Sequence, residues 1–315
     1  MKMAGIIATC LIVVGLVVGF VGMASVGFDF SRLVHHETQT AEYSIEEPFT
    51  SVSVENANVF DVTLRPSEDG SCKIVSEETD LLYATPTVES GTLRIKVTDA
   101  RKWYHNIFSF YQVKVTVYLP EQVYESIAVD CVTGDVSISN MITNTLSVEL
   151  TTGDVYVTDV TAAESMNVTV TTGDVSLANV ETTTLSVDST TGDVSASDVV
   201  VGVATFESTT GDVSLSNVTA DGIHFNVTTG DVSLSNVQAT QQLYGDTTTG
   251  SVTLDHCDSI DVWIVTTTGD IRGSICTEKI FITDTSTGDI DVPQSVTGNI
   301  CRLETTTGDI VIWIG

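Results

Sequence analysis

Basic residues are scarce in this chain of 315 residues. Lys and Arg number 12 against 42 Asp and Glu, and neither occurs anywhere between Val115 and Ile271. A surface of this charge repels phosphate backbones, so the sequence excludes nucleic acid as a partner. The acidic excess also favours solubility and opposes association between exposed strand edges.

Motifs of catalysis are missing as well. The sequence contains no Walker loop, nucleophile elbow, HExxH motif, CxxC pair or paired zinc-ligand spacing, and its five His form no ligand set by their spacing. We therefore predict a protein that is not an enzyme, with no catalytic residues and no cofactor.

What the sequence does contain is a Thr-Gly-Asp signature that returns every 19 or 20 residues. Each glycine follows Thr, and Asp follows all of them except Gly250, which precedes Ser251. A short, steady period of this kind indicates a solenoid whose units cannot bury a core alone. The ten glycines are Gly134, Gly153, Gly173, Gly192, Gly211, Gly230, Gly250, Gly269, Gly288 and Gly308.

Within each unit, apolar residues alternate with polar ones. The second residue after every glycine is Val or Ile, the fourth is usually apolar, and the same rhythm precedes the Thr-Gly pair, as at Leu146, Val148 and Leu150. Period-two alternation predicts strands, two short ones in each unit. Thr-Gly-Asp supplies one corner, and a second corner is expected six residues after glycine. It is occupied by Asn140, Asp159, Asn179, Asp198, Asn217 and Asn236.

These features predict an all-β protein, a parallel β-solenoid of about ten coils over residues 130–315. At a coil spacing of ~4.8 Å, ten coils would make a rod about 50 Å long. A stack of antiparallel hairpins is the alternative, although hairpins do not require equivalent residues to repeat so strictly. The register places Val or Ile at the second position after glycine in the core and the Asp outside.

Residues 1–33 differ from the rest. No charged residue lies between Ala4 and Phe28, a run long enough to span a bilayer. Lys2 and the amino terminus precede it, and the acidic remainder follows Arg32. This asymmetry favours one transmembrane helix with the β-domain outside the cell membrane. A cleaved signal peptide is the alternative, because Gly22, Met23 and Ala24 resemble a cleavage site.

Residues 40–129 have strand signals without the repeat. Candidate strands cover residues 51–54, 59–64, 72–76, 92–97 and 113–118. We interpret this section as an irregular β cap that shields the end of the solenoid core. At the other end, residues 310–314 finish the chain on a strand, which leaves an edge that could associate end to end with another copy.

Equivalent residues should form columns along the rod. Calcium takes oxygen ligands from carboxylates, so one hypothesis is a calcium-binding rod. The alternative is that each Asp caps its own turn. The calcium candidates are Asp135, Asp154, Asp174, Asp193, Asp212 and Asp231. Cys257 and Cys276 also lie at equivalent positions of adjacent coils. They could form a disulfide, but we favour the interpretation that both are buried thiols.

Three features together resemble a known family. They are the amino-terminal apolar span, the aromatic-rich residues 103–111 leading into residues 113–120, and the TTGDV coils. The chain resembles, over roughly residues 40–315, bacterial membrane-anchored proteins of the DUF4097 type, which are labelled adhesins. The resemblance implies a β-strand-repeat rod on the cell envelope without catalytic residues.

We therefore expect a non-enzymatic module anchored in the cell membrane that acts in surface interaction or as a spacer. Its partners would be the membrane and a surface protein or polysaccharide. The alternatives are an envelope-stress sensor or regulator acting through a partner membrane protein, and the calcium-binding rod. Clustered aromatic residues favour interfaces when exposed. The candidate contact patch in the cap is Trp103, Tyr104, Phe108, Phe110 and Tyr111.

Overall fold

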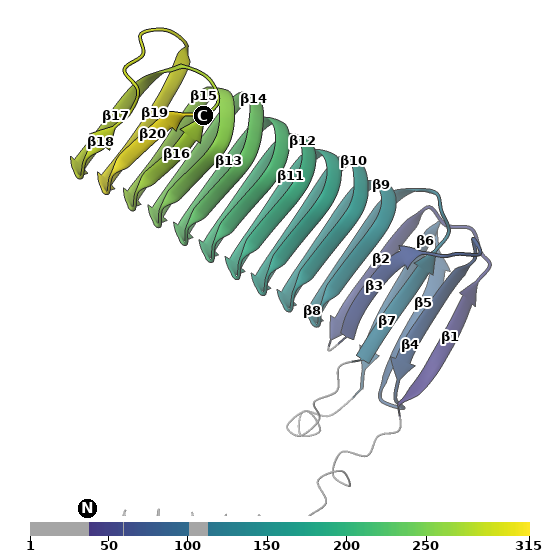
Figure 1. Cartoon of the computed structure of the whole chain (residues 1–315). Coiled ribbons are helices and arrows are strands. Elements are labelled where there is room, and N and C mark those ends of the chain that lie inside the picture. The colour runs from purple at the N-terminus through teal and green to yellow at the C-terminus, as the bar shows by residue number, and fades with distance from the viewer. Residues whose placement is uncertain (1–37, 59, 101–112) are drawn as a thin grey trace, which may run out of the picture.

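The computed structural model describes residues 38–58, 60–100 and 113–315. Strands are the regular elements of this part, and they join into one sheet that winds into a long rod (Figure 1). Within these ranges, no helix has the length and apolar character needed to cross a membrane. The span expected at residues 4–28 lies outside the described residues and stays a prediction.

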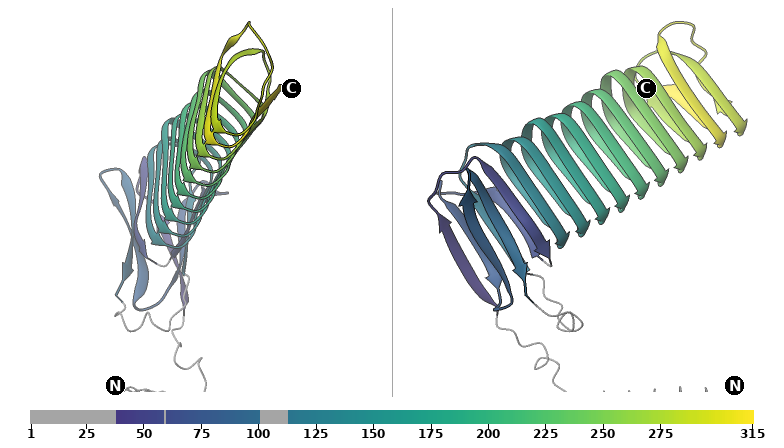
Figure 2. Two further views of the ribbon diagram at one scale, coloured as in Figure 1. Left: turned by 90° about the vertical axis from the view of Figure 1, so that its left-hand side faces the viewer. Right: turned by 180° about the vertical axis from the view of Figure 1, so that it is seen from behind.

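Seven strands of 17 or 18 residues form the middle of the rod, each of them one complete coil. Each pairs in parallel with the next, so that Val175 lies opposite Val194 and Phe206 opposite Phe225. The coils are flattened into two strips that face each other across the core (Figure 2). The strands are β9 (Val136–Thr152), β10 (Val155–Thr172), β11 (Val175–Thr191), β12 (Val194–Thr210), β13 (Val213–Thr229), β14 (Val232–Thr249) and β15 (Val252–Thr268). The predicted parallel solenoid of about ten coils is therefore confirmed, and the hairpin stack is wrong for the rod.

The two expected corners differ in kind. At Thr-Gly-Asp the strand breaks, and Gly192, for example, has a φ of 133°. At the second corner the strand continues, although Asn179 and its equivalents adopt the left-handed conformation, with φ of 53° at Asn179. Asn and Asp tolerate this conformation better than other residues with a Cβ. Each unit is thus one bent strand rather than the predicted pair of short strands.

The alternation predicted from the sequence fixes the core. In β11, inward residues such as Val175, Leu177 and Leu185 are buried, whereas their sequence neighbours face solvent. Equivalent inward positions stack along the rod, and at one of them two side chains are complementary in size. Phe225 lies opposite Gly245, and a Cβ at Gly245 would lie 1.8 Å from the Phe225 ring. The missing side chain makes room for the ring.

The strands that precede the repeat are not threaded in sequence order. Four candidate strands lie within longer ones, and β3 contains residues 60–64 of the fifth, whose first residue lies outside the described residues. Three further strands, β1, β5 and β8, were not among the candidates. The coil made by β2 and β3 is inserted between β6–β7 and the first repeat coil, because β2 pairs with both β6 and β8. Antiparallel β1, β4 and β5 close the end beyond it. The strands are β1 (Gln39–Ile45), β2 (Ser51–Asn58), β3 (Phe60–Pro66), β4 (Cys72–Glu78), β5 (Leu82–Glu89), β6 (Thr92–Asp99), β7 (Val113–Leu119) and β8 (Val123–Thr133).

The carboxyl-terminal end is also threaded out of order. It contains β16 (Ile271–Ile275), β17 (Lys279–Thr287), β18 (Ile290–Asp291), β19 (Asn299–Thr307) and β20 (Ile310–Ile314). The last coil, β19–β20, is inserted between β15–β16 and β17–β18. The expectation that residues 310–314 form the edge holds only in part, because β18 pairs with Ile310 and Val311, whereas residues 312–314 have no strand partner on that side. β17 and β18 form the rest of the edge. Association through this edge stays a prediction. Ile290 follows its glycine by two residues but is 45% exposed, since no further coil covers it.

The register can be tested within one coil. Val194 is 1% exposed and Val200 is 55% exposed, and both lie in β12. Replacing Val194 by Asp puts an unpaired charge into the core, so we expect a loss of about 3 kcal/mol or more in the free energy of unfolding. The matched control Val200→Asp should cost only about 1 kcal/mol, because its side chain stays in solvent although it faces Glu181 on the neighbouring coil. Denaturant unfolding measures both, and a stable Val194→Asp variant would contradict the register.

Candidate functional site

The Thr-Gly-Asp corners stack directly on one another. A Cβ on Gly192 would lie 2.0 Å from the carbonyl oxygen of Gly173, so the corner requires glycine for its close approach as well as for its positive φ. The Asp that follows projects along the rod axis, where its carboxylate reaches the neighbouring corner. The outward faces of the coils carry the columns of side chains that can meet a ligand or partner.

The aspartates form one continuous hydrogen-bonded column. The backbone N–H of Asp212 donates to Oδ1 of Asp193 over 2.8 Å, and the N–H of Asp193 donates to Oδ1 of Asp174 over 2.8 Å. The same bond joins Asp135 to Asp61, which brings the cap into the column at 3.1 Å. The expectation that each Asp caps its own turn is wrong, because the partner belongs to the next coil.

The six calcium candidates all lie in this column. Their Oδ1 atoms accept backbone hydrogen bonds, for example that of Asp154 from the N–H of Asp174. In the part of the chain that the structure describes, no group of three or more His, Cys, Asp or Glu side chains is placed to hold a metal ion. The column gives each carboxylate a structural partner, and calcium binding stays a prediction.

A second column runs along the left-handed corner. Asn217 donates from Nδ2 to Oδ1 of Asp198 over 3.0 Å, and Asn236 donates in the same way to Asn217 over 2.9 Å. These bonds tie side chains of successive coils together as the aspartate column does. The residues expected at the second corner therefore have a stacking role.

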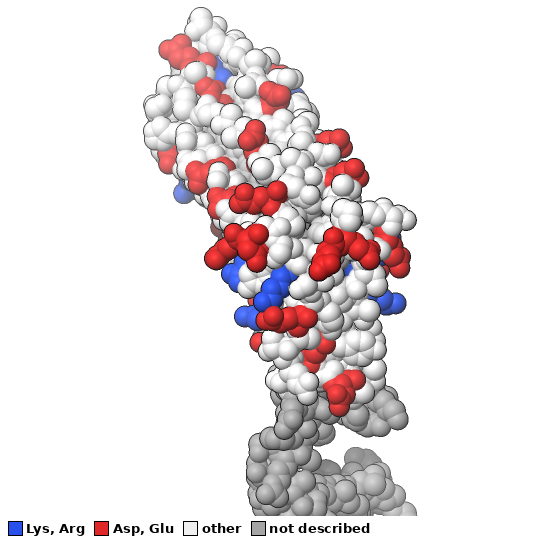
Figure 3. All heavy atoms as spheres, turned by 90° about the vertical axis from the view of Figure 1, so that its right-hand side faces the viewer, with Lys and Arg blue, Asp and Glu red and all other residues white. Residues whose placement is uncertain are grey.

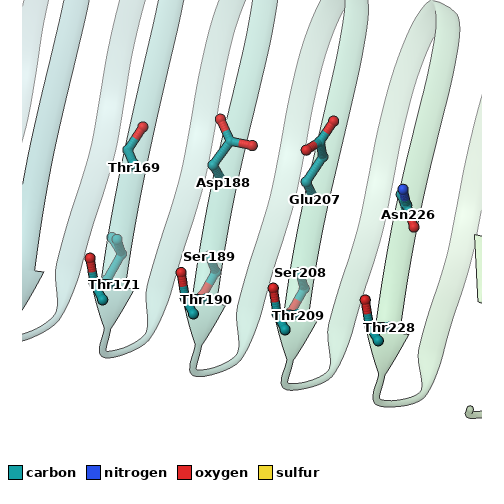
Figure 4. Close-up of a pocket in the computed structure, with 11 residues that line it drawn as sticks. Thr169, Thr171, Asp188, Ser189, Thr190, Glu207, Ser208, Thr209, Asn226 and Thr228 are labelled. Atoms are coloured by element: carbon teal, nitrogen blue, oxygen red, sulfur yellow. The ribbon is translucent and has the colours of Figure 1, made fainter.

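Threonine and acidic side chains line a small depression near the Thr-Gly corners (Figure 4). It has a volume of about 230 Å³ and lies across several coils, with Thr190 and Thr209 at its lower margin and Asp188 and Glu207 above them. Its polar lining lacks the predominantly apolar surface of small-molecule sites. We assign it no ligand.

The most distinctive outward column is aromatic. His224, Tyr244 and Trp263 occupy the same position on β13, β14 and β15, and Arg302 of β19 follows them. The ring centroids of His224 and Tyr244 are 5.7 Å apart, and Tyr244 meets Trp263 edge to face at 5.3 Å. The Arg302 guanidinium lies 5.3 Å from the centre of the Trp263 ring. We name these four residues the aromatic column.

Sequence reasoning missed the aromatic column, although a signal was available. Tyr244 and Trp263 directly follow the buried residues Leu243 and Val262, so the alternation already places them outside. Acidic residues border the column, among them Asp261 on the next outward position. The candidate patch at Trp103, Tyr104, Phe108, Phe110 and Tyr111 lies outside the described residues and stays a prediction.

Positive charge is confined to the two ends of the described chain. Figure 3 shows basic side chains on the cap and acidic ones over the surface in view. On the cap, Lys73 forms an ion pair of 2.9 Å with Glu42, and Arg65 lies over the ring of Tyr118 at 4.5 Å from its centre. The coils between carry no basic residue to attract an anionic ligand.

The cysteines of the described part are mostly buried. Burial raises the pKa of the Cys131 and Cys301 thiols to about 12, and those of Cys72 and Cys257 to about 11. Cys257 and Cys276 carry free thiols. The expected burial holds for Cys257 only, because β16 takes a different path and Ile275 lies opposite Cys257 in place of Cys276. A thiol with a raised pKa is a poor nucleophile, which gives Cys257 a packing role.

A buried ion pair fastens the outermost coil. Lys279 is 2% exposed, and its Nζ lies 2.6 Å from Oδ1 of Asp258 and donates to the Ser259 carbonyl. The pair joins β17 to β15 across the inserted β19. Breaking one partner of a buried pair is strongly destabilising, so the contact holds the end of the rod in place.

Fold and surface together define the class of protein. It is a parallel β-solenoid whose outward columns offer extended contact, and the described residues assemble no catalytic constellation. The chain belongs to the Toastrack DUF4097 family, whose model matches residues 49–205 and 192–314. No curated protein matches the chain.

Solved structures with a similar fold are distant in sequence. One from Parabacteroides distasonis, described as a "putative adhesin", is 12% identical with a TM-score of 0.50, and the match covers 88% of this chain and 97% of that one. A second "putative adhesin", from Bacteroides fragilis, is 15% identical with a TM-score of 0.38 and the same coverage of both chains. A third, from Parabacteroides merdae, is 12% identical with a TM-score of 0.41, over 89% of this chain and 98% of that one. The likeness to the first shows the fold alone.

Two substitutions at Asp193 distinguish the hydrogen-bonding role of the aspartate column from the effect of its charge. Asp193→Ala removes the acceptor of the Asp212 N–H, so we expect a loss of about 1 kcal/mol in the free energy of unfolding. Asp193→Asn keeps an acceptor oxygen and removes one of a row of like charges, so its stability should equal or exceed that of the wild type. Denaturant unfolding with and without calcium measures both. An Asn variant destabilised only when calcium is present would instead support a bound cation.

Proposed function

We propose that this protein is a non-enzymatic interaction rod, held on the outer face of the cell membrane by its amino-terminal span. The observation that carries the proposal is the aromatic column on an otherwise repetitive, acidic surface. Trp, Tyr and Arg are the side chains that most often anchor protein interfaces. The names of the similar solved structures agree with a role in adhesion.

The partner that best fits the aromatic column is a protein of the cell envelope. Tyr244 and Arg302 flank Trp263 on both sides, and this packing pre-organises a large ring that is still 43% exposed. Pre-organised aromatic side chains lose little conformational freedom on binding. The acidic border favours a partner with basic residues around an apolar centre. The binding experiment described below distinguishes a protein partner from a polysaccharide partner.

Repetition extends this contact along the rod. Contacts made by several coils at once raise the overall affinity through effective concentration, without a deep pocket. The aspartate column continues from the cap into the rod, so the structure provides a stiff support for the contact surface. The regulator and calcium alternatives stay predictions, because no contact among the described residues favours them.

The aromatic column can be tested with a matched control. Trp263→Ala should reduce binding of labelled protein to envelope fractions by about tenfold or more, because truncating an anchor removes most of its contact area. Tyr156 is also 43% exposed but lies on β10, outside the column, so Tyr156→Ala should bind like the wild type. Cross-linking and protease treatment of the captured partner identify it as protein or polysaccharide. Equal binding by both variants would remove the column from the proposal.

Membrane anchoring has a separate test. Protease added to intact cells should digest the β-domain and leave a membrane-bound fragment from the amino terminus, because the apolar run at residues 4–28 and its flanking charges favour an external carboxyl-terminal domain. Immunoblotting with antibodies to each end follows both parts. Digestion that occurs only after lysis would reverse the topology, and release of intact protein into the medium would support a cleaved signal peptide.

A further inference from the structure

The two ends of the rod differ in how they finish the core. At the amino-terminal end, β1, β4 and β5 run antiparallel and fold over the core, so that Leu82 on the outermost strand β5 is only 1% exposed. Pro86 lies on the same strand, and proline blunts a sheet edge by removing a donor. Among the described strands, β1 pairs only with β4 and β5 only with β6, so each keeps an unpaired edge, but the core beneath them is covered.

The carboxyl-terminal end lacks such a closure within the described residues. β17 pairs only with β19, and β18 pairs only with β20, so both strips of the last coil present an unpaired edge. Ile290 is 45% exposed although its stacked equivalents Ile271 and Ile310 are fully buried. Phe281, opposite the buried Cys301, is likewise only partly covered. The core of the rod therefore ends in the open.

Apolar exposure is concentrated at the same end. Nine of the sixteen exposed large hydrophobic side chains in the described part belong to residues 260–314, among them Ile280, Ile282 and Ile300. Exposed apolar patches larger than scattered single residues mark interaction sites. The unpaired edge and the apolar side chains coincide, so one partner can satisfy both.

Charge disfavours contact between two copies along the middle of the rod. Two rods with a formal net charge of −30 each repel along most of their length. Arg272, Lys279 and Arg302 follow a stretch from Val115 to Ile271 that has no basic residue. Repulsion between copies is therefore weaker at an end of the rod than along these coils.

We propose that two copies of this chain associate tail to tail through β17 and β18, as a dimer with one two-fold axis. If the axis passes perpendicular to both flattened strips, β17 pairs antiparallel with its copy and β18 does the same on the opposite strip. A single extended peptide would cover one strip only, whereas a second copy presents two edges at the same separation. A two-fold interface is self-complementary and closed, so it produces dimers rather than filaments.

The dimer has a consequence for the aromatic column. Ile282 continues this column onto β17, beside Arg302. Rotation about an axis normal to the sheet keeps both columns on the same face of the double rod. The two copies would then present their contact surfaces together, which raises avidity for a partner with repeated sites. The dimer itself does not depend on the identity of that partner.

The oligomeric state tests the proposal. The full chain, purified in detergent, should be dimeric by sedimentation with detergent subtraction, and electron microscopy should show particles about twice the length of one rod. The double variant Ile282→Lys and Ile290→Lys puts four like charges into the interface, so its dimer should weaken by about tenfold or more. Both residues are exposed, so thermal melting should show that the variant stays folded.

The control places the same charge elsewhere on the rod. Ile142 is exposed on β9, far from the open end, so Ile142→Lys should leave the dimer unchanged. A monomeric wild type at micromolar concentration would overturn the proposal. So would a dimer of single-rod length, which indicates side-by-side packing, or a dimer that the double variant leaves intact. A dimer that the double variant leaves intact would indicate that the two copies associate through the amino-terminal segment instead.

Discussion

Parallel, in-register stacking of coils is the constraint on which the rest of this structure depends. Because each backbone N–H must meet a carbonyl one coil away, equivalent positions lie directly above one another, and every side chain packs on its own repeat. The corner then requires glycine, since a Cβ at Gly192 would strike the Gly173 carbonyl. It also places an aspartate where its carboxylate accepts the next Asp N–H, as in Asp193 and Asp212. Inward side chains of successive coils also share one space, as Phe225 and Gly245 show, where the missing side chain of Gly245 makes room for the Phe225 ring.

A solenoid built in this way has two ends, and near each end one coil is inserted out of sequence order. At the amino-terminal end, β2 and β3 lie between coils that come later in the chain, and antiparallel strands then cover the core. At the carboxyl-terminal end, β19 and β20 are inserted beneath β17 and β18, and the buried Lys279–Asp258 pair fastens the outer coil. Covering an edge prevents uncontrolled pairing. The open end, in contrast, offers a defined edge for one partner.

The regular part of the surface carries little specific information, because hydrogen bonds within the Asp and Asn columns already use many of its polar groups. Specific chemistry appears where an outward position departs from the repeat. The aromatic column is such a departure, since Ser, Asn or Thr occupies the same outward position in earlier coils, as Ser186 and Thr205 show. A family whose members share the rod can thus differ in function through a few outward residues, without any change in the core.

The sequence by itself determined the coil, its register and its buried face, because alternation and turn chemistry act within about 20 residues and repeat with each unit. The columns at Asp193 and Asn217 followed from that period alone. The order of the terminal coils did not, since residues 279–291 and 299–314 both fit the repeat and only long-range pairing decides which of them lies against β15. The same applies to the acceptor of each Asp N–H, to the approach of Tyr244 to Trp263, and to the pairing of Lys279 with Asp258. These contacts join residues from different coils, so only the tertiary structure could fix them.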